Sequence, residues 1–144
     1  MSLNNKKMVV VSACLAGINC RYDCKIKPNK KVVELIKKGN AIPVCPEQLG
    51  GLPTPRIAAE RAGDKVLRKD GVDVTEEFTT GAREALKIAK LVGCKTAILK
   101  ARSPSCGSGK IYDGNFTGTL INGDGICAEL FKKNGIKVIT EEEL

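Results

Sequence analysis

The sequence of 144 residues contains no histidine and no tryptophan, and its aromatic side chains are limited to two tyrosines and three phenylalanines. The absence of histidine excludes Ser-His-Asp and Cys-His catalysis, histidine-ligated zinc or haem, and a histidine general base. Acid–base chemistry therefore has to come from Glu, Asp, Lys, Tyr, Cys or Ser. With so few aromatic rings, we do not expect a platform that stacks the bases of single-stranded nucleic acid.

Long apolar runs are also missing, since no run approaches the ~18 residues that a membrane-spanning helix needs. The apolar stretch before Cys14 covers only Met8 to Ala13, which is too short for a lipoprotein signal. We expect a cytoplasmic protein without a membrane partner. The net charge of +8 comes from scattered lysines with no run of about five like charges, so it favours a solvated surface over a nucleic-acid partner. No pattern in the sequence bears on the oligomeric state.

Seven cysteines are the most unusual feature that is present. Their odd number does not suit a closed set of disulfides, and a chain of this length does not need disulfides for stability. We therefore expect reduced cysteines, some acting as ligands or catalytic groups and others as small core residues. They are Cys14, Cys20, Cys24, Cys45, Cys94, Cys106 and Cys127.

Alternating strand and helix patterns predict one α/β domain over residues 1–144, with residues 1–7 as a disordered or expression-derived start. The expected fold class is a three-layer Rossmann-like sandwich with a largely parallel central sheet and small hairpin excursions. The expected strands of that sheet are Met8–Ala13, Ala41–Cys45, Thr96–Lys100 and Lys137–Thr140. The expected helices are Asn29–Lys38, Thr75–Val92 and Asp124–Gly135.

Capping and turn residues predict where these elements end. Asn29, Thr75 and Asp124 are the expected N-caps of the three helices. The segment 46–56, rich in Pro and Gly, is expected to be an irregular loop. A hairpin is expected around Asp70-Gly71, because Asp-Gly favours tight turns, and a hairpin or a two-turn excursion is expected around Asp113-Gly114.

Three of the cysteines lie at or just after the carboxyl ends of predicted strands. Cys14 follows the first strand, Cys45 ends the second, and Cys106 lies in the loop after the third. Ligands of parallel sheets bind beyond the carboxyl ends of the strands, so we expect these thiols at one edge of the sheet. Three thiolates without histidine suit an iron–sulfur cluster or a zinc ion. A four-iron cluster with only three protein ligands keeps one iron open to water or substrate.

Other residues near these cysteines are candidates for the same site. Glu47 is the natural general base or acid, unless it only accepts backbone hydrogen bonds in a tight loop. Ser103 is suited to hold a substrate or water, unless it only forms the turn before a proline. Cys20 and Cys24 are candidate extra thiols, either as a fourth ligand or as partners of another thiol on oxidation. Cys94 and Cys127 are expected to be small core residues.

Five separated segments match one known family in order: VSACLAGINCRYD, PVCPEQLGGLPTPR, DVTEEFTTGA, AILKARSPSCG and IYDGNFTG. Together they resemble a family of small bacterial cysteine-rich proteins that was long catalogued as a domain of unknown function. Some of its members are thiouracil desulfidases. The resemblance runs from about Met8 to Thr140. It departs at position 24, where this chain has Cys and the family usually has Gly.

The resemblance implies a set of roles for the candidate residues. It implies that Cys14, Cys45 and Cys106 bind a [4Fe-4S] cluster with one open iron, and that Glu47 and Ser103 are the catalytic pair. Arg56 is a candidate substrate-binding residue. Because an open iron is oxidised easily, we expect the cluster to be lost on purification in air.

The activity that the resemblance implies is removal of sulfur from a thiolated heterocycle, as a free base or a nucleotide. The iron would take up the thiocarbonyl sulfur, Glu47 would help water to attack the carbon or move a proton, and sulfide would leave without net redox change. Two alternatives stay open. One is a non-catalytic iron–sulfur or sulfur-transfer accessory protein, and the other is an α/β domain with zinc or with thiol-redox chemistry.

Overall fold

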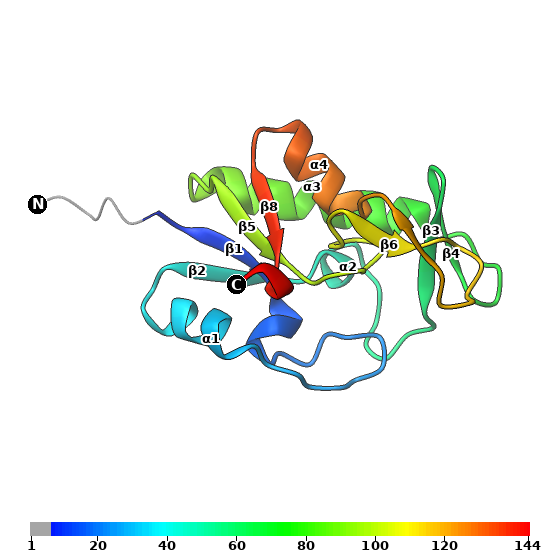
Figure 1. The fold of residues 1–144 in the computed structure, drawn as a ribbon, viewed down its shortest axis with the longest axis horizontal. Coiled ribbons are helices and arrows are strands. Elements are labelled where there is room, and N and C mark those ends of the chain that lie inside the picture. The colour runs from blue at the N-terminus through cyan, green and yellow to red at the C-terminus, as the bar shows by residue number, and fades with distance from the viewer. Residues whose placement is uncertain (1–6) are drawn as a thin grey trace, which may run out of the picture.

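The computed structural model describes residues 7–144, so the prediction for the start of the chain lies almost entirely outside the described residues. Its centre is a parallel four-stranded sheet with the order β2-β1-β5-β8 (Figure 1). The strands are β1 (Val9–Ser12), β2 (Ala41–Val44), β5 (Thr96–Leu99) and β8 (Lys137–Thr140). All four predicted strands are therefore present, and the register places Val9 opposite both Ala41 and Thr96.

Helices cover both faces of this sheet and produce the predicted three layers (Figure 1). One face carries the 3-10 helix η1 (Ala13–Ala16) and α1 (Lys30–Lys37), and the other carries α3 (Thr75–Leu91) and α4 (Ile126–Lys133). Side chains alternate between the two faces along β1. Val10 packs in the core under α3 and α4, whereas Val11 packs in the core under α1, and both are fully buried.

Two antiparallel hairpins complete the architecture, together with a C-terminal 3-10 helix. They are β3 (Ala59–Ala62) with β4 (Lys65–Arg68), and β6 (Lys110–Tyr112) with β7 (Leu120–Asn122), and the 3-10 helix is η2 (Glu141–Glu143). The second hairpin confirms the prediction around Asp113-Gly114. The hairpin predicted at Asp70-Gly71 is only partly present, because β4 pairs with β3 and the chain after Gly71 forms a single bridge through Asp73. Helix α3 begins two residues later, which leaves no room for a second strand.

One of the three predicted helix caps is confirmed and two are wrong. The Asn29 side chain accepts hydrogen bonds from two backbone N–H groups in the first turn of α1. Thr75 is the first residue of α3 rather than its cap, and its hydroxyl accepts from the backbone of Val66 in β4. Asp124 lies one residue before the cap of α4, and its carboxylate accepts from the backbone of Gly109. Both side chains therefore form contacts between segments instead of local caps.

The segment 46–56, predicted to be irregular, begins with the short helix α2 (Pro46–Leu49). This helix lies against α3 at two glycines. A Cβ atom on Gly81 would lie 1.8 Å from the carbonyl oxygen of Pro46, and one on Gly50 would lie 1.9 Å from a carbonyl oxygen of α3. Only glycine at both positions permits such a close approach, so the contact fixes the segment that follows β2.

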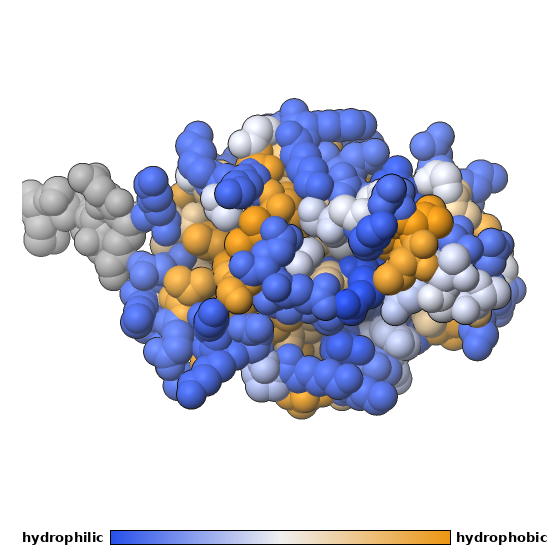
Figure 2. All heavy atoms as spheres, viewed as in Figure 1, coloured by the Kyte–Doolittle hydropathy of each residue, from blue (hydrophilic) through white to orange (hydrophobic). Residues whose placement is uncertain are grey.

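The surface has no large apolar region on the side seen in Figure 2, where hydrophobic residues form small separate groups among hydrophilic ones. This distribution agrees with the expectation that the 24 Lys and Arg residues form a solvated surface. Among the described residues, no helix combines the length and the apolar character needed to cross a bilayer.

Candidate metal centre

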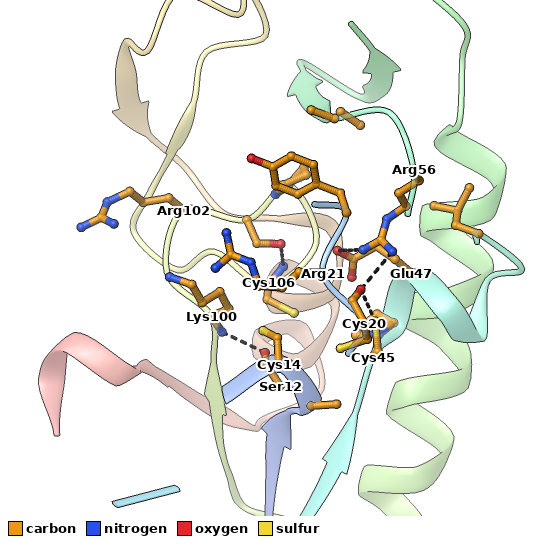
Figure 3. Close-up of a pocket in the computed structure, with 18 of the residues that line it drawn as sticks. Ser12, Cys14, Cys20, Arg21, Cys45, Glu47, Arg56, Lys100, Arg102 and Cys106 are labelled. Carbon is orange, nitrogen blue, oxygen red and sulfur yellow. Dashed lines mark hydrogen bonds and ion pairs between the residues drawn. The ribbon is translucent and has the colours of Figure 1, made fainter. Parts of the chain in front are cut away.

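Cys14, Cys45 and Cys106 line one cavity of about 790 Å³ at the carboxyl ends of three neighbouring strands (Figure 3). Cys14 lies in η1 directly after β1, and Cys45 is the residue that precedes α2 directly after β2. Cys106 lies in the loop that leaves β5. Because β1 is hydrogen-bonded to both β2 and β5, the three thiols come from adjacent positions along one edge of the sheet. The predicted convergence is therefore confirmed.

A fourth thiol, that of Cys20, lies next to two of these. It is within hydrogen-bonding reach of the thiols of both Cys14 and Cys45, and the residue is only 2% exposed. Hydrogen bonding with Cys20 lowers the pKa of the Cys14 and Cys45 thiols, although burial acts in the opposite direction. The same hydrogen bonds raise the pKa of Cys20. The neighbouring Cys20 thiol therefore favours the ionised form of the Cys14 and Cys45 thiols.

Cys106 is more buried than Cys14 and Cys45, at 3% exposure. Burial raises the pKa of its thiol well above the ordinary value, and the charge of Glu47 adds to this effect. Ser12, the last residue of β1, opposes it through a hydrogen bond to the sulfur. The Ser12 hydroxyl accepts from the backbone N–H of Lys100 at 2.8 Å, which leaves its own hydrogen available to the thiol. Ser12 was not among the residues predicted from the sequence, although a serine that ends an apolar strand two residues before Cys14 was an available signal.

Glu47 lies in the first turn of α2 and lines the cavity. Its negative charge raises the pKa of the thiols of Cys14, Cys45 and Cys106. The guanidinium of Arg56 donates from Nη2 to Glu47 Oε2 at 3.3 Å (Figure 3). The structure thus brings the candidate substrate-binding arginine into direct contact with the candidate catalytic carboxylate.

Ser103 lines the same cavity and also organises the loop that carries Cys106. Its Oγ accepts hydrogen bonds from the backbone N–H groups of Ser105 and Cys106, at 3.1 Å and 3.0 Å. The turn-forming role expected of this serine is therefore present. The hydroxyl hydrogen is not used by these two bonds and remains available to a ligand in the cavity.

The remaining three cysteines do not line the cavity. Cys94 and Cys127 are buried in the main hydrophobic core, as predicted. Cys24 is exposed, and its backbone has a left-handed φ of 59°. Glycine adopts this conformation most easily, which gives a physical reason for the glycine that resembling sequences usually have at position 24.

The donor set suits an iron–sulfur cluster better than a single metal ion. Within residues 7–144, no three thiol, carboxylate or imidazole side chains converge as the ligands of one ion do. The cavity thiols instead come from three separate strand ends, and soft thiolates are the ligands that iron–sulfur clusters take. All seven cysteines are free thiols, so no disulfide withdraws any of them from this role.

Comparison with known proteins shows which family the chain belongs to. The sequence profile of the 2-thiouracil desulfurase family matches residues 9–143. The chain belongs to this family. One relative is the Bacillus subtilis (strain 168) protein named "Uncharacterized protein YbbK", which is 43% identical over 147 residues that cover 95% of this chain and 97% of that protein.

A solved structure is similar over almost the whole chain. It is the "[4Fe-4S]-dependent thiouracil desulfidase TudS (DUF523Vcz)", with a TM-score of 0.92 and 45% sequence identity over 96% of this chain and 93% of that chain. This similarity confirms the predicted α/β fold class, and the profile match confirms the resemblance drawn from the five sequence segments. The region matched by the 2-thiouracil desulfurase family contains every cavity residue described above.

Proposed function

We propose that this protein is a desulfidase that hydrolyses the C=S bond of a thiolated heterocycle, such as a thiopyrimidine base or nucleotide. The atoms balance without a redox partner, because the thiocarbonyl compound and one water give the oxo compound and hydrogen sulfide. The observation that supports this most is that thiols from three neighbouring strand ends share one cavity with Glu47. Family membership and the similarity to a [4Fe-4S]-dependent thiouracil desulfidase support it independently.

In this proposal Cys14, Cys45 and Cys106 hold a [4Fe-4S] cluster, and no protein side chain is bound to the fourth iron. When bound, the cluster supplies a soft Lewis acid for the sulfur of the substrate. The three thiols differ in how readily they become ligands. Cys14 and Cys45 have lowered pKa values through Cys20, whereas the buried Cys106 has to lose a proton from a site that raises its pKa. Loading of the site therefore releases protons and becomes less favourable at low pH.

Glu47 and Ser103 would perform the proton chemistry. Oε2 of Glu47 is held by Arg56, so Oε1 is the atom that would take a proton from the attacking water. The Ser103 oxygen already accepts two backbone hydrogen bonds, so its hydroxyl would act as a donor to the substrate or to the water. Residues lining the cavity thus supply both a base and a hydrogen-bond donor without histidine.

Protein prepared and reconstituted without oxygen tests this proposal. We expect about four irons and four acid-labile sulfides per chain, and release of sulfide from 2-thiouracil. Cys45→Ala should lose both the brown colour and sulfide release, while Cys24→Ser, a change to an exposed thiol outside the cavity, should keep both. A colourless Cys45→Ala protein that still releases sulfide would contradict the proposal.

Glu47→Gln separates catalysis from cluster binding. This variant should keep its iron and lose turnover by about 10²–10⁴-fold, because the amide does not accept the proton of water. Full turnover by the loaded variant would remove Glu47 from the mechanism. A wild-type protein that binds the cluster but releases no sulfide from thiolated bases would instead favour a non-catalytic iron–sulfur protein.

A further inference from the structure

The side chain of Arg56 makes four hydrogen bonds to other residues of the chain. Nη2 donates to Glu47 Oε2 at 3.3 Å. Nη1 donates to the carbonyl oxygens of Cys20 and Pro53, at 3.0 Å and 3.1 Å, and to Thr54 Oγ1 at 3.2 Å. The side chain is only 10% exposed and that of Glu47 only 15%. Both hydrogens of Nη1 are therefore committed to acceptors in two separate loops.

These anchors join the segments that surround the cavity. The carbonyl oxygen of Cys20 belongs to the loop after η1, and it also lies 3.9 Å from the Cys45 sulfur, which donates to it. The backbone N–H of Arg56 donates to the carbonyl of Tyr22 in the same loop, at 3.0 Å. Arg56 thus connects the loop next to Cys14 with the start of α2, where Cys45 and Glu47 lie.

A guanidinium is planar and rigid, so anchors on one nitrogen fix the direction of the others. With Nη1 held by two carbonyls and a hydroxyl, the position of Nη2 is determined, and Nη2 in turn fixes one oxygen of Glu47. A lysine would place one positive charge near the carboxylate, but its flexible ammonium group would not fix the orientation of the Glu47 carboxylate. The ion pair is also largely shielded from solvent, so loss of Arg56 would leave a partly buried carboxylate without its counter-charge.

We infer that Arg56 is a positioning residue that fixes the orientation of the Glu47 carboxylate toward the cavity thiols, and that it acts through Glu47 rather than through substrate affinity. This inference rests on the proposed role of Glu47 as the base. If Arg56 positions Glu47, its loss lowers the rate of the chemical step. If Arg56 bound the substrate, its loss would lower the affinity for the substrate. The two roles therefore differ in the kinetic constant that changes when Arg56 is replaced.

A double-mutant cycle with Glu47→Gln and Arg56→Gln tests the inference on the loaded enzyme, with 2-thiouracil as the probe. Arg56→Gln should lower kcat by about 10–100-fold and change KM by less than about two-fold. In the Glu47→Gln background, Arg56→Gln should have little further effect on kcat, because no carboxylate base remains to be oriented. Arg56→Lys should recover only part of kcat. A rise in KM, or losses that multiply in the double variant, would overturn the inference.

Two further readouts do not depend on turnover. Iron per chain should be unchanged in each variant, so that a lower kcat does not reflect a lost cluster. In the metal-free chain, the decreases in Tm caused by Glu47→Gln and Arg56→Gln should be less than additive, as expected for groups in direct contact. Additive decreases would show that the two side chains are not coupled, and would also count against the inference.

Gln48→Ala is the matched control for a loosened loop. The exposed Gln48 donates to Thr54 Oγ1 at 2.9 Å, so this change weakens the same loop at a hydroxyl that Arg56 also contacts, and it leaves the Arg56–Glu47 pair itself in place. It should leave kcat within about two-fold of the wild-type value. If Gln48→Ala lowers kcat as much as Arg56→Gln does, general loosening of the loop explains the loss and the inference fails. If loaded Glu47→Gln keeps full turnover, the role of Glu47 fails first, and there is then no base for Arg56 to position.

Discussion

The backbone of Gly81 in α3 meets the carbonyl oxygen of Pro46 in α2 so closely that a Cβ atom on Gly81 would lie 1.8 Å from that oxygen. Pro46 is the residue between Cys45 and Glu47, and it is almost completely buried. A candidate ligand and the candidate base therefore lie on either side of a residue that is pressed against the long helix. The position of both side chains depends on the small size of residue 81.

Gly81→Ala should displace α2 and impair the site. Alanine favours helix over glycine by about 1 kcal/mol, so intrinsic propensity alone predicts a more stable protein. The clash with Pro46 acts in the opposite direction, and overpacking of this kind typically costs about 1–3 kcal/mol. We expect lower iron content after reconstitution and a lower free energy of unfolding, measured by urea denaturation of the metal-free chain. Thr80→Ala, at the exposed neighbouring position of α3, should lower neither the iron content nor the free energy of unfolding. A Gly81→Ala protein that loads normally would show that the contact does not determine the site.

The strand ends of this fold could be predicted from the sequence, because β-branched apolar runs followed by Cys or loop residues are local patterns. The contacts of single polar side chains could not. Thr75 and Asp124 are residue types that often cap helices. Each instead accepts a hydrogen bond from the backbone of another segment, at Val66 and Gly109 respectively. The pairing of Arg56 with Glu47 depends on the path of the loop between them, which no periodicity describes.

Cys24→Gly should stabilise the protein. Cys24 has a left-handed φ of 59°, which costs a residue with a Cβ atom about 1–2 kcal/mol. Glycine removes this cost, although its greater freedom in the unfolded chain offsets about 0.5–1 kcal/mol. We expect a net increase of about 0.5–1 kcal/mol in the free energy of unfolding, measured by urea denaturation.

Cys24→Ala is the control for this prediction, because alanine removes the thiol and keeps the backbone strain. It should show no gain in stability, and both variants should bind as much iron as the wild type. Equal stability of the Gly and Ala variants would show that the backbone at position 24 is not strained.

Glu141 should contribute stability that is lost in acid. Its carboxylate accepts from Lys100 Nζ and from the backbone N–H of Ala101, both at 2.8 Å. Burial raises the pKa of Glu141, but these hydrogen bonds outweigh burial, so the pKa is lowered from its ordinary value of 4.5. A carboxyl group with a lowered pKa in the folded state stabilises the protein above the unfolded pKa. That contribution disappears as the pH falls through the lower, folded pKa.

Glu141→Gln should therefore reduce the stability of the metal-free chain at pH 7 by about 1 kcal/mol, and should flatten the pH dependence below the ordinary pKa. Urea denaturation at a series of pH values measures both effects. Glu84→Gln is the control, because its ion pair with Lys87 is exposed on the surface of α3 and such pairs contribute little. If wild type and Glu141→Gln lose stability in parallel as the pH falls, the bonds to Lys100 and Ala101 do not lower the pKa of Glu141.

Oxidation of the metal-free chain should join Cys20 to Cys14 or to Cys45. The Cys20 thiol is within hydrogen-bonding reach of both, whereas the other thiol of the cavity, Cys106, is engaged by Ser12. In the reaction two thiols lose two protons and two electrons to oxygen or to a small-molecule disulfide, and one disulfide forms. The free-thiol count should then fall from seven to five, since one disulfide uses two thiols. Peptide mapping should find Cys20 in the bridge.

This bridge would block a cluster ligand, so air-exposed wild-type protein should need a reductant before it can be reconstituted. Cys20→Ser should bind iron with much less reductant, because its ligand thiols have no neighbour with which to form this bridge. Cys24→Ser should behave as the wild type does, since Cys24 is exposed and outside the cavity. A bridge that contains Cys106, or seven thiols that persist in air, would contradict the prediction. Either result would show that the contacts of Cys20 with Cys14 and Cys45 do not direct the oxidation of this site.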